Sequence, residues 1–233
     1  MRALARNGFT TDQVKLAIHA PWGSQQVRFR YERLNAANAK VADLTNVLSA
    51  SVSQNALADI KRRATFRLED DSTINFLSDR IKPYVQVRVP PGILNGMPAT
   101  GGWAEFPLGV FLLSRPKKKY EASGAIIREV EAYDQNQVLM DDKVTGKYLI
   151  AAGTNFITAI ATILTGAGIT QQNLAGTTKT IPVDREWDGG TSKLAIVNDL
   201  LEAINYYSLY FDEDGVAIAT PYVLPSEAPS EYT

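Results

Sequence analysis

Apolar and polar residues alternate along much of the first two thirds of the chain with a period of two, the pattern of half-buried β-strands. The alternation is clear in residues 27–32, 48–53, 63–68, 84–89 and 126–133. Residues 14–19 also alternate, although a short helix beginning at Asp12 is an alternative there. Repeated short strands, separated by turn residues and with little helix before Gln135, predict an antiparallel β-sandwich or barrel.

The stretch GGWAEFPLGVFLLSRP, residues 101–116, predicts two short strand segments joined by a corner. The segments are Trp103–Phe106 and Gly109–Leu113, because Pro107 cannot donate to a strand ladder and Gly109 permits a bulge. We expect these segments to pair with each other and Lys117–Lys119 to form the turn that follows. The predicted core comprises Phe29, Tyr31, Phe66, Leu68, Val85, Val87, Phe111 and Leu113.

The last third of the chain changes to helices with apolar stripes, joined by loops and short strands. Thr154 is the expected cap of a first helix, which stops at Gly166. A second helix follows a cap at Thr191 or Ser192. A hairpin is predicted around Asp212-Glu213-Asp214-Gly215, since Asp-Gly is a favoured hairpin turn.

These patterns predict a mainly β protein with an added α+β part. We expect an N-terminal arm or first strand over residues 1–23 and an antiparallel β-barrel or sandwich over residues 24–145. A small α+β domain over residues 146–222 and a Pro-rich C-terminal extension over residues 223–233 follow. The extension has no cap or core of its own, so we expect the chain to continue beyond Thr233 or to pack on a neighbour.

Composition excludes several classes of function. The chain has 233 residues, enough for a sizeable core, and its 24 Lys and Arg balance 25 Asp and Glu, so no overall charge attracts nucleic acid or anionic membranes. Without cysteine it has no disulfide, thiolate zinc site or thiol nucleophile. The apolar runs are too short to insert in a membrane. The single histidine, His19, is expected at the edge of a strand rather than in a catalytic triad, because no G-x-S-x-G motif is present.

Asp184, Glu186 and Asp188 in the segment VDREWDGG are the candidate catalytic residues. In an extended segment they share one face, and paired carboxylates can serve a glycosidase. The alternative is structural, because acidic residues near a helix N-terminus interact favourably with its dipole. Trp187 points to the other side and is expected to anchor the helix to the sheet. We favour the structural interpretation, since carboxylate pairs outside a cleft are common on protein surfaces.

The remaining motifs carry weaker signals. Asp212, Asp214 and Gly215 resemble part of a calcium loop, but the glycine follows the second aspartate at once, which favours the hairpin turn. The basic runs Arg115–Lys119 and Lys61–Arg63 have few interleaved aromatic residues and are expected to be solvated. Residues 166–168 end a helix, so they are not a phosphate loop. The sequence therefore assigns no catalytic, cofactor-binding or metal-ligating residue, and we expect no enzyme and no cofactor.

Four segments together resemble the N-terminal part of phage minor tail proteins, a family similar to the tail-tip (baseplate) hubs of tailed phages and to tail-associated proteins of siphophages. The segments are LEDDSTINFLSDRIKPYVQVRV, WAEFPLGVFLLSRP, IIREVEAYD and IPVDREWDGGTSKLAIVNDLLEAINYYSLYFDEDGVAIATPY. The resemblance covers about residues 40 to 225 and rests on strand-and-turn patterns, without an invariant catalytic signature.

The resemblance implies a tail-tube-like antiparallel β-barrel with a small α+β domain, assembled as a ring that closes or adapts the tail tube at the tail tip of the virion. Family hubs are usually trimers that surround the channel for DNA and the tape-measure protein. The implied partners are further copies of the chain and neighbouring tail-tip, distal-tail and tape-measure proteins, with DNA only in transit. Synthesis in the host cytoplasm precedes assembly. Many members carry a further C-terminal part that binds a receptor or digests the cell wall, and we expect neither role of this chain.

The sheet edges are the expected contact surfaces in such a ring. The strands YVQVRV and LLSRP are little blunted beyond a few basic residues, so we expect neighbouring copies to cover them. The alternating face of Lys61, Arg63, Thr65 and Arg67 is expected to meet either the DNA channel or a neighbouring protein layer.

Two other classes of function stay open. One is a tail-associated cell-wall hydrolase that acts through the three carboxylates named above. The other is a glycan-binding module that uses Trp22, Trp103 or Trp187 as a stacking platform.

Overall fold

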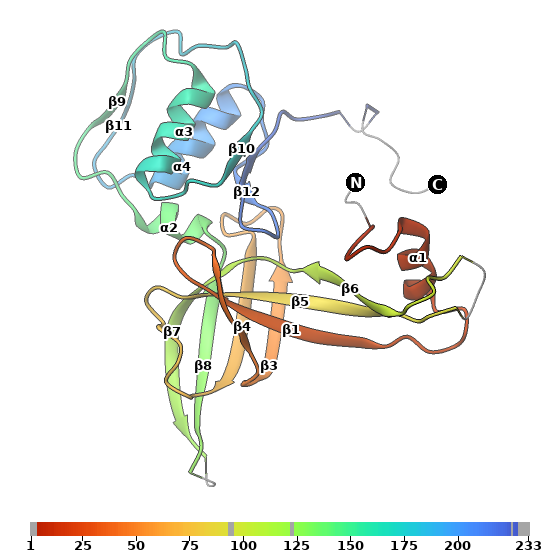
Figure 1. Ribbon diagram of the computed structural model, residues 1–233. Coiled ribbons are helices and arrows are strands. Elements are labelled where there is room, and N and C mark those ends of the chain that lie inside the picture. The colour runs from red at the N-terminus through yellow and green to blue at the C-terminus, as the bar shows by residue number, and fades with distance from the viewer. Residues whose placement is uncertain (1–3, 93–95, 122–123, 225, 228–233) are drawn as a thin grey trace.

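The computed structural model describes residues 4–92, 96–121, 124–224 and 226–227. Figure 1 shows a large curled sheet, a smaller C-terminal unit of helices and short strands beside one end of it, and a short helix at the N-terminal arm. Three separate clusters of buried apolar side chains stabilise these parts. The predicted fold class, mainly β with a small α+β part, is confirmed.

The large sheet is antiparallel and contains eight strands within the described ranges. They are β1 (Val27–Leu34), β2 (Lys40–Leu44), β3 (Val47–Gln54), β4 (Arg62–Glu69), β5 (Arg80–Val89), β6 (Gly102–Pro107), β7 (Phe111–Tyr120) and β8 (Ile126–Tyr133). Their order is β2-β1-β5-β7-β8-β4-β3, and β6 pairs with the outer part of β5. The alternating stretches therefore form strands as predicted, whereas β2 has no counterpart among the predicted strands.

The sheet curls so that its two edge strands, β2 and β3, meet at one end of a barrel. These strands are consecutive in the chain and are joined by residues 45–46. Leu44 of β2 and Val52 of β3 pack against the same cluster as Phe66 and Phe111. The rings of Phe66 and Phe111 pack edge to face with centroids 6.1 Å apart, a geometry that aromatic rings favour. Along the strand order the sheet ends at β2 on one side and at β3 on the other.

One member of the predicted core is wrong. Phe66, Leu68, Val87 and Phe111 are buried, and Tyr31, Val85 and Leu113 are half-buried. Phe29, in contrast, is 60% exposed. It shares a face of β1 with Tyr31, but its side chain lines a surface cleft and not the core.

Strand β5 lies in the middle of the sheet, so the expectation that YVQVRV forms an edge is wrong. It pairs with β1 on one side, and with β6 and then β7 on the other. The segments β6 and β7 therefore pair in succession with β5. The prediction that they pair with each other is wrong. The corner between them contains Gly109, whose φ of +139° few other residues adopt.

Strand β7 continues through Lys117–Lys119, so the predicted turn there is wrong. A register shift between Ser114 and Lys117 takes Arg115 and Pro116 out of the ladder with β8. A proline is tolerated at such a bulge because no ladder hydrogen bond needs its nitrogen. Strand β5 pairs with β7 only at Phe111 and Leu112, so in the described chain residues 113–116 have a neighbouring strand, β8, on one side alone. The expectation of an open edge is therefore correct for this part of LLSRP and wrong for Leu112.

The N-terminal arm contains helix α1 (Thr11–His19), so the predicted first strand is wrong and the alternative helix is correct. The Thr10 hydroxyl accepts from the N–H of Gln13, and the Gln13 side chain accepts from the N–H of Thr10, which makes a capping box. Val14 and Ala17, three residues apart, are buried against β5 and β6. His19 accordingly lies in the last turn of a helix and not at a strand edge.

The C-terminal unit packs α3 (Phe156–Gly166) against α4 (Lys193–Ala203), and the short α2 (Asn136–Asp141) leads into it. Its strands are β9 (Tyr148–Ile150), β10 (Gln172–Leu174), β11 (Arg185–Trp187), β12 (Tyr210–Phe211) and β13 (Ala217–Ala219). Ser192 caps α4 as predicted. Asn155 caps α3 in place of the predicted Thr154, because its side chain accepts from two backbone N–H groups of the first turn.

Candidate functional site

The acidic turn of residues 212–215 joins the C-terminal unit to the barrel. Within the turn, the N–H of Asp214 donates to Asp212 Oδ1 at 2.9 Å. Glu213 pairs with Arg62 of β4 at 3.0 Å, and Asp214 pairs with Lys82 of β5 at 2.7 Å. The predicted hairpin is confirmed. The carboxylates of Glu213 and Asp214 pair with cationic side chains of the protein, whereas in a calcium loop the carboxylates bind the ion.

A buried polar network holds the other side of this junction. The Gln135 amide donates to the carbonyl oxygen of Gly215 at 2.9 Å. The Asp134 carboxylate accepts from the N–H of Arg62 at 2.8 Å and from that of Asn136 at 3.0 Å. Asp134 is 2% exposed, and this burial raises the pKa of its carboxyl above the usual value, although both hydrogen bonds oppose the shift.

The basic run Lys61–Arg63 belongs in part to the same junction. Lys61 Nζ donates to Ser208 Oγ of the C-terminal unit at 2.9 Å, and partial burial lowers the pKa of its ammonium group. Arg62 is only 5% exposed. The prediction that this run is solvated is therefore wrong for these two residues and correct for Arg63.

The three candidate catalytic residues are exposed, and each makes a separate contact through its side chain or its backbone. Asp184 accepts from the N–H of Ala152 at 2.8 Å, and Glu186 pairs with Lys147. The carbonyl oxygen of Asp188 accepts from the hydroxyl of Thr191 near the start of α4. This arrangement fits the structural interpretation of the segment.

The three tryptophans lie apart, and each has its ring or its indole N–H in contact with another group of the protein. The guanidinium of Arg28 lies 4.0 Å from the centroid of Trp103. Trp22 donates to the carbonyl oxygen of Ser24 at 2.7 Å. Trp187 packs on the core of the C-terminal unit and donates to Asp199 of α4 at 3.1 Å, in agreement with its predicted role as an anchor.

Two kinds of functional feature are absent from the ranges that the structure describes. No group of three or more histidine, aspartate or glutamate side chains is arranged to hold a metal ion. No helix is long and apolar enough to cross a bilayer.

An apolar cleft opens where the barrel wall is interrupted between β1 and β3. Strand β2 pairs with β1 only from Tyr31 onward, so in the described chain the first half of β1 has no partner strand on that side. Strand β3 has only β4 as a neighbour. Phe29 and Leu48, which are 60% and 52% exposed, line this cleft of about 420 Å³. Open strand edges beside exposed apolar side chains suit pairing with another chain.

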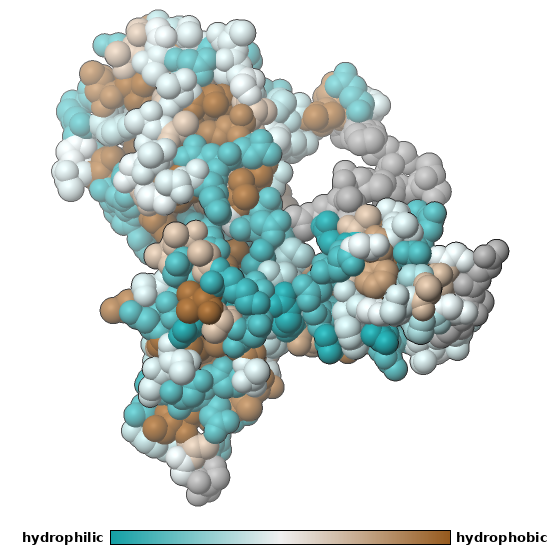
Figure 2. Space-filling model, in the orientation of Figure 1, coloured by the Kyte–Doolittle hydropathy of each residue, from teal (hydrophilic) through white to brown (hydrophobic). Residues whose placement is uncertain are grey.

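The surface elsewhere is mixed in character. Figure 2 shows apolar residues in separate patches over both units, divided by hydrophilic ones, on the face that it presents. The exposed face of β4 contains Arg63, Thr65 and Arg67 as predicted, but Glu129 and Glu131 of β8 lie directly beside the last two. A partner for this face therefore meets alternating charge and not a uniform basic surface.

Comparisons of the sequence identify no relative, since no family model and no curated protein matches it. The solved structures that are similar in fold include two tail proteins. The tail protein from Neisseria meningitidis MC58 aligns with a TM-score of 0.55 and 7% identity over 82% of this chain and 50% of that one. The prophage MuSo2 43 kDa tail protein from Shewanella oneidensis aligns with a TM-score of 0.50 and 10% identity over 82% of this chain and 52% of that one. The chain thus shares their fold and spans about half their length.

Sequence reasoning does not find the open cleft or the junction. The cleft depends on strand order, which alternation does not specify. For the junction one signal is present: the run Asp134-Gln135-Asn136 is polar directly after a buried strand, and these residues are nearly inaccessible. Buried polar runs of this kind are hydrogen-bonded to other elements as a rule.

Proposed function

We propose that this chain is a structural component of a phage tail and forms a ring, or hub, that closes or adapts the tail tube at the tail tip. The fold supports the proposal, because it is shared with tail proteins from Neisseria and from a Shewanella prophage. The sequence segments that resemble phage minor tail proteins support it independently. Under this proposal the chain has no enzymatic role, and DNA and the tape-measure protein pass through the ring.

The observation that carries the proposal is the open wall between β1 and β3. Phe29 and Leu48 are exposed beside two strand edges without partners in the described chain, an arrangement that favours association with another chain. In a closed ring every copy covers the exposed surface of the next, so no edge is left to start a filament. A trimer is the favoured ring, with neighbouring tail-tip, distal-tail and tape-measure proteins above and below it.

The junction suits such a building block. Ion pairs and buried hydrogen bonds tie the hairpin of residues 212–215 to β4, β5 and the end of β8. The two units therefore present their surfaces in one fixed relation, which identical contacts around a ring require.

Charged substitutions in the cleft test the proposal. Phe29→Lys and Leu48→Lys change exposed side chains, so both variants should fold, while the cost of burying a lysine should prevent the contact between copies. In a phage that lacks its own copy of the gene, we expect the double variant to yield no assembled tails. Leu149→Lys and Val183→Lys, at residues 56% and 66% exposed in the C-terminal unit, are the matched control and should restore assembly. Normal tails from the folded cleft variant would overturn the proposal.

A further inference from the structure

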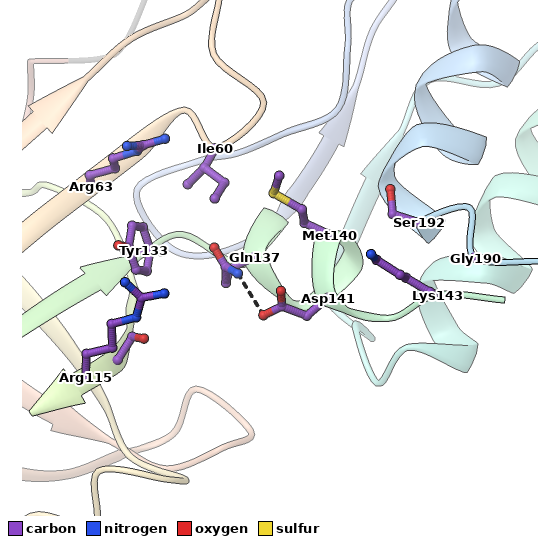
Figure 3. Close-up of a pocket in the computed structure, with 11 residues that line it drawn as sticks. Ile60, Arg63, Arg115, Tyr133, Gln137, Met140, Asp141, Lys143, Gly190 and Ser192 are labelled. Atoms are coloured by element: carbon purple, nitrogen blue, oxygen red, sulfur yellow. Dashed lines mark hydrogen bonds between the residues drawn. The ribbon is translucent and has the colours of Figure 1, made fainter. Parts of the chain in front are cut away.

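A second pocket, which the proposed function does not use, lies between the barrel and the C-terminal unit. It has a volume of about 510 Å³ and is lined by residues of β4, β7 and β8 on one side and of α2 and the start of α4 on the other. Figure 3 shows Arg63 and Arg115 on the barrel side and Lys143 on the opposite side, each from a different part of the chain. Three cationic side chains therefore border one concavity.

These three cations lack anionic partners among the described residues. Arg63, Arg115 and Lys143 have no ion pair or side-chain hydrogen bond, and Arg63 has only a contact with the Tyr133 ring at 5.8 Å. Nearby cations differ, since Lys119 pairs with Glu129 and Lys193 pairs with Asp142. Unpaired cations gathered in one concavity have the charge to bind a carboxylate.

The backbone at Arg115 is held in an uncommon conformation. Its φ is +48°, a left-handed region that a long side chain seldom adopts. Arg115 lies at the bulge of β7, between Ser114 and Lys117, where two residues leave the ladder. The bulge re-aims the chain so that Arg115 lines the pocket, and backbone strain of this kind is often found at binding sites.

The pocket favours carboxylates of a protein over a nucleic acid backbone. Its wall contains the carboxylate of Asp141, which accepts from Gln137 Nε2 at 2.7 Å (Figure 3). Glutamates alternate with the lysines on the adjacent β7–β8 surface. A polynucleotide needs a continuous basic stripe, whereas separate carboxylates on a peptide can reach the cations individually.

The C-terminal extension of the chain is an acidic segment of the required kind. Hydrogen bonds attach its beginning to the C-terminal unit, from the N–H of Tyr222 to Asn205 and from the Tyr207 hydroxyl to Val223. Beyond these contacts Glu227 is exposed and has no cationic partner in the described chain, and Glu231 follows in the sequence.

We propose that Arg63, Arg115 and Lys143 form a binding site for the acidic C-terminal segment of a second copy of the chain, residues 221–233, which includes the extension. Charge complementarity between the pocket and Glu227 and Glu231 is the basis of recognition. Because the extension and the pocket are different surfaces, the contact is heterologous, and a heterologous contact forms a ring when its rotation closes. The inference deepens the proposed ring by naming one of its contacts.

Binding of a synthetic peptide tests this site directly. The probe is a labelled peptide with the sequence PYVLPSEAPSEYT, titrated with the full chain at a concentration where the chain is monomeric, with fluorescence anisotropy as the readout. We expect saturable binding that weakens with salt. Replacement of both glutamates of the peptide by glutamine should weaken it about tenfold or more, since it removes two charge-assisted contacts.

The matching change in the protein is Arg115→Gly with Lys143→Ala, because glycine accepts the φ of Arg115 without strain. This double variant should bind the peptide about tenfold or more weakly. The control, Lys15→Ala with Lys118→Ala, removes two other cations that have no ion pair in the described chain and should bind as wild type does. Absence of peptide binding, or equal binding by the two double variants or by the two peptides, would overturn the inference. None of these results would test the proposed ring, which is tested on the assembled particle.

Discussion

The side-chain amide of Gln135 donates a hydrogen bond of 2.9 Å to the carbonyl oxygen of Gly215, which joins the end of the barrel to the hairpin of the C-terminal unit. A Cβ atom on Gly215 would lie 2.9 Å from Gln135 Nε2 and 3.0 Å from Val110. The backbone of Gly215 also has a φ of +82°. This position therefore requires glycine both for its conformation and for the close approach of the two units.

Gly215→Ala should destabilise the protein more than Gly153→Ala does. The two glycines have nearly the same φ, +82° and +83°, but a Cβ on Gly153 would meet open space. Gly153→Ala thus measures the backbone strain alone, about 1 kcal/mol, and Gly215→Ala adds overpacking of about 1–3 kcal/mol. Urea denaturation of both variants measures the difference. Equal losses would mean that the hairpin does not pack closely on the barrel.

The stability of the fold should depend on the protonation of Asp134. Burial raises the pKa of this carboxyl in the folded state, so between the ordinary aspartate pKa, about 3.9, and the raised value the folded state binds more protons. The contribution of Asp134 to the free energy of unfolding therefore falls as the pH rises through this window.

Asp134→Asn removes the titrating group and provides the comparison. The free energy of unfolding of wild type minus that of the variant, measured in urea from about pH 4 to pH 7, should decrease as the pH rises. A difference that stays constant or increases with pH would contradict the assignment of a raised pKa to Asp134.

Phe66 should be among the largest single contributors to the barrel core. Its side chain is fully buried and packs against the rings of Tyr31 and Phe111. Phe66→Ala should lower the free energy of unfolding by about 3–5 kcal/mol. Phe29→Ala removes an aromatic ring from the same sheet at an exposed position, so the isolated chain should lose no more than about 0.5 kcal/mol. Similar losses from the two substitutions would contradict the strand order described above.

The isolated chain should have no cell-wall hydrolase activity. Asp184, Glu186 and Asp188 are exposed, and their side chains or backbone are engaged by neighbouring groups, whereas an acid–base pair requires an enclosed site that separates the two pKa values. Release of soluble fragments from peptidoglycan should be at background level for wild type and for Asp184→Asn/Glu186→Gln/Asp188→Asn alike. Turnover by wild type that the triple variant lacks would establish the hydrolase alternative.

The sequence predicts the strands well because half-buried strands impose a period of two on their side chains. The alternation in residues 63–68 appears in β4 as strictly alternating burial. The same rule fails for α1, where the alternation of residues 14–19 is accidental and the Thr10–Gln13 capping box determines the helix.

The strand order and the junction could not be predicted in the same way. Alternation shows that β5 has a buried face but does not reveal which strands flank it, so a central strand was indistinguishable from an edge. Phe29 has the pattern of a core residue but lines an open cleft beside the part of β1 with which β2 does not pair. The ion pairs of Glu213 and Asp214 join residues more than a hundred positions apart, a relation that no local pattern contains.

An electron cryomicroscopy map of the particle that contains this chain tests the central claim most directly, because it gives both the position of the chain and its symmetry. We predict copies related by cyclic symmetry, with threefold symmetry favoured, around the tail axis at the tip, and with the cleft between β1 and β3 covered by another chain. A single copy away from the tail axis, with that cleft open to solvent, would contradict it.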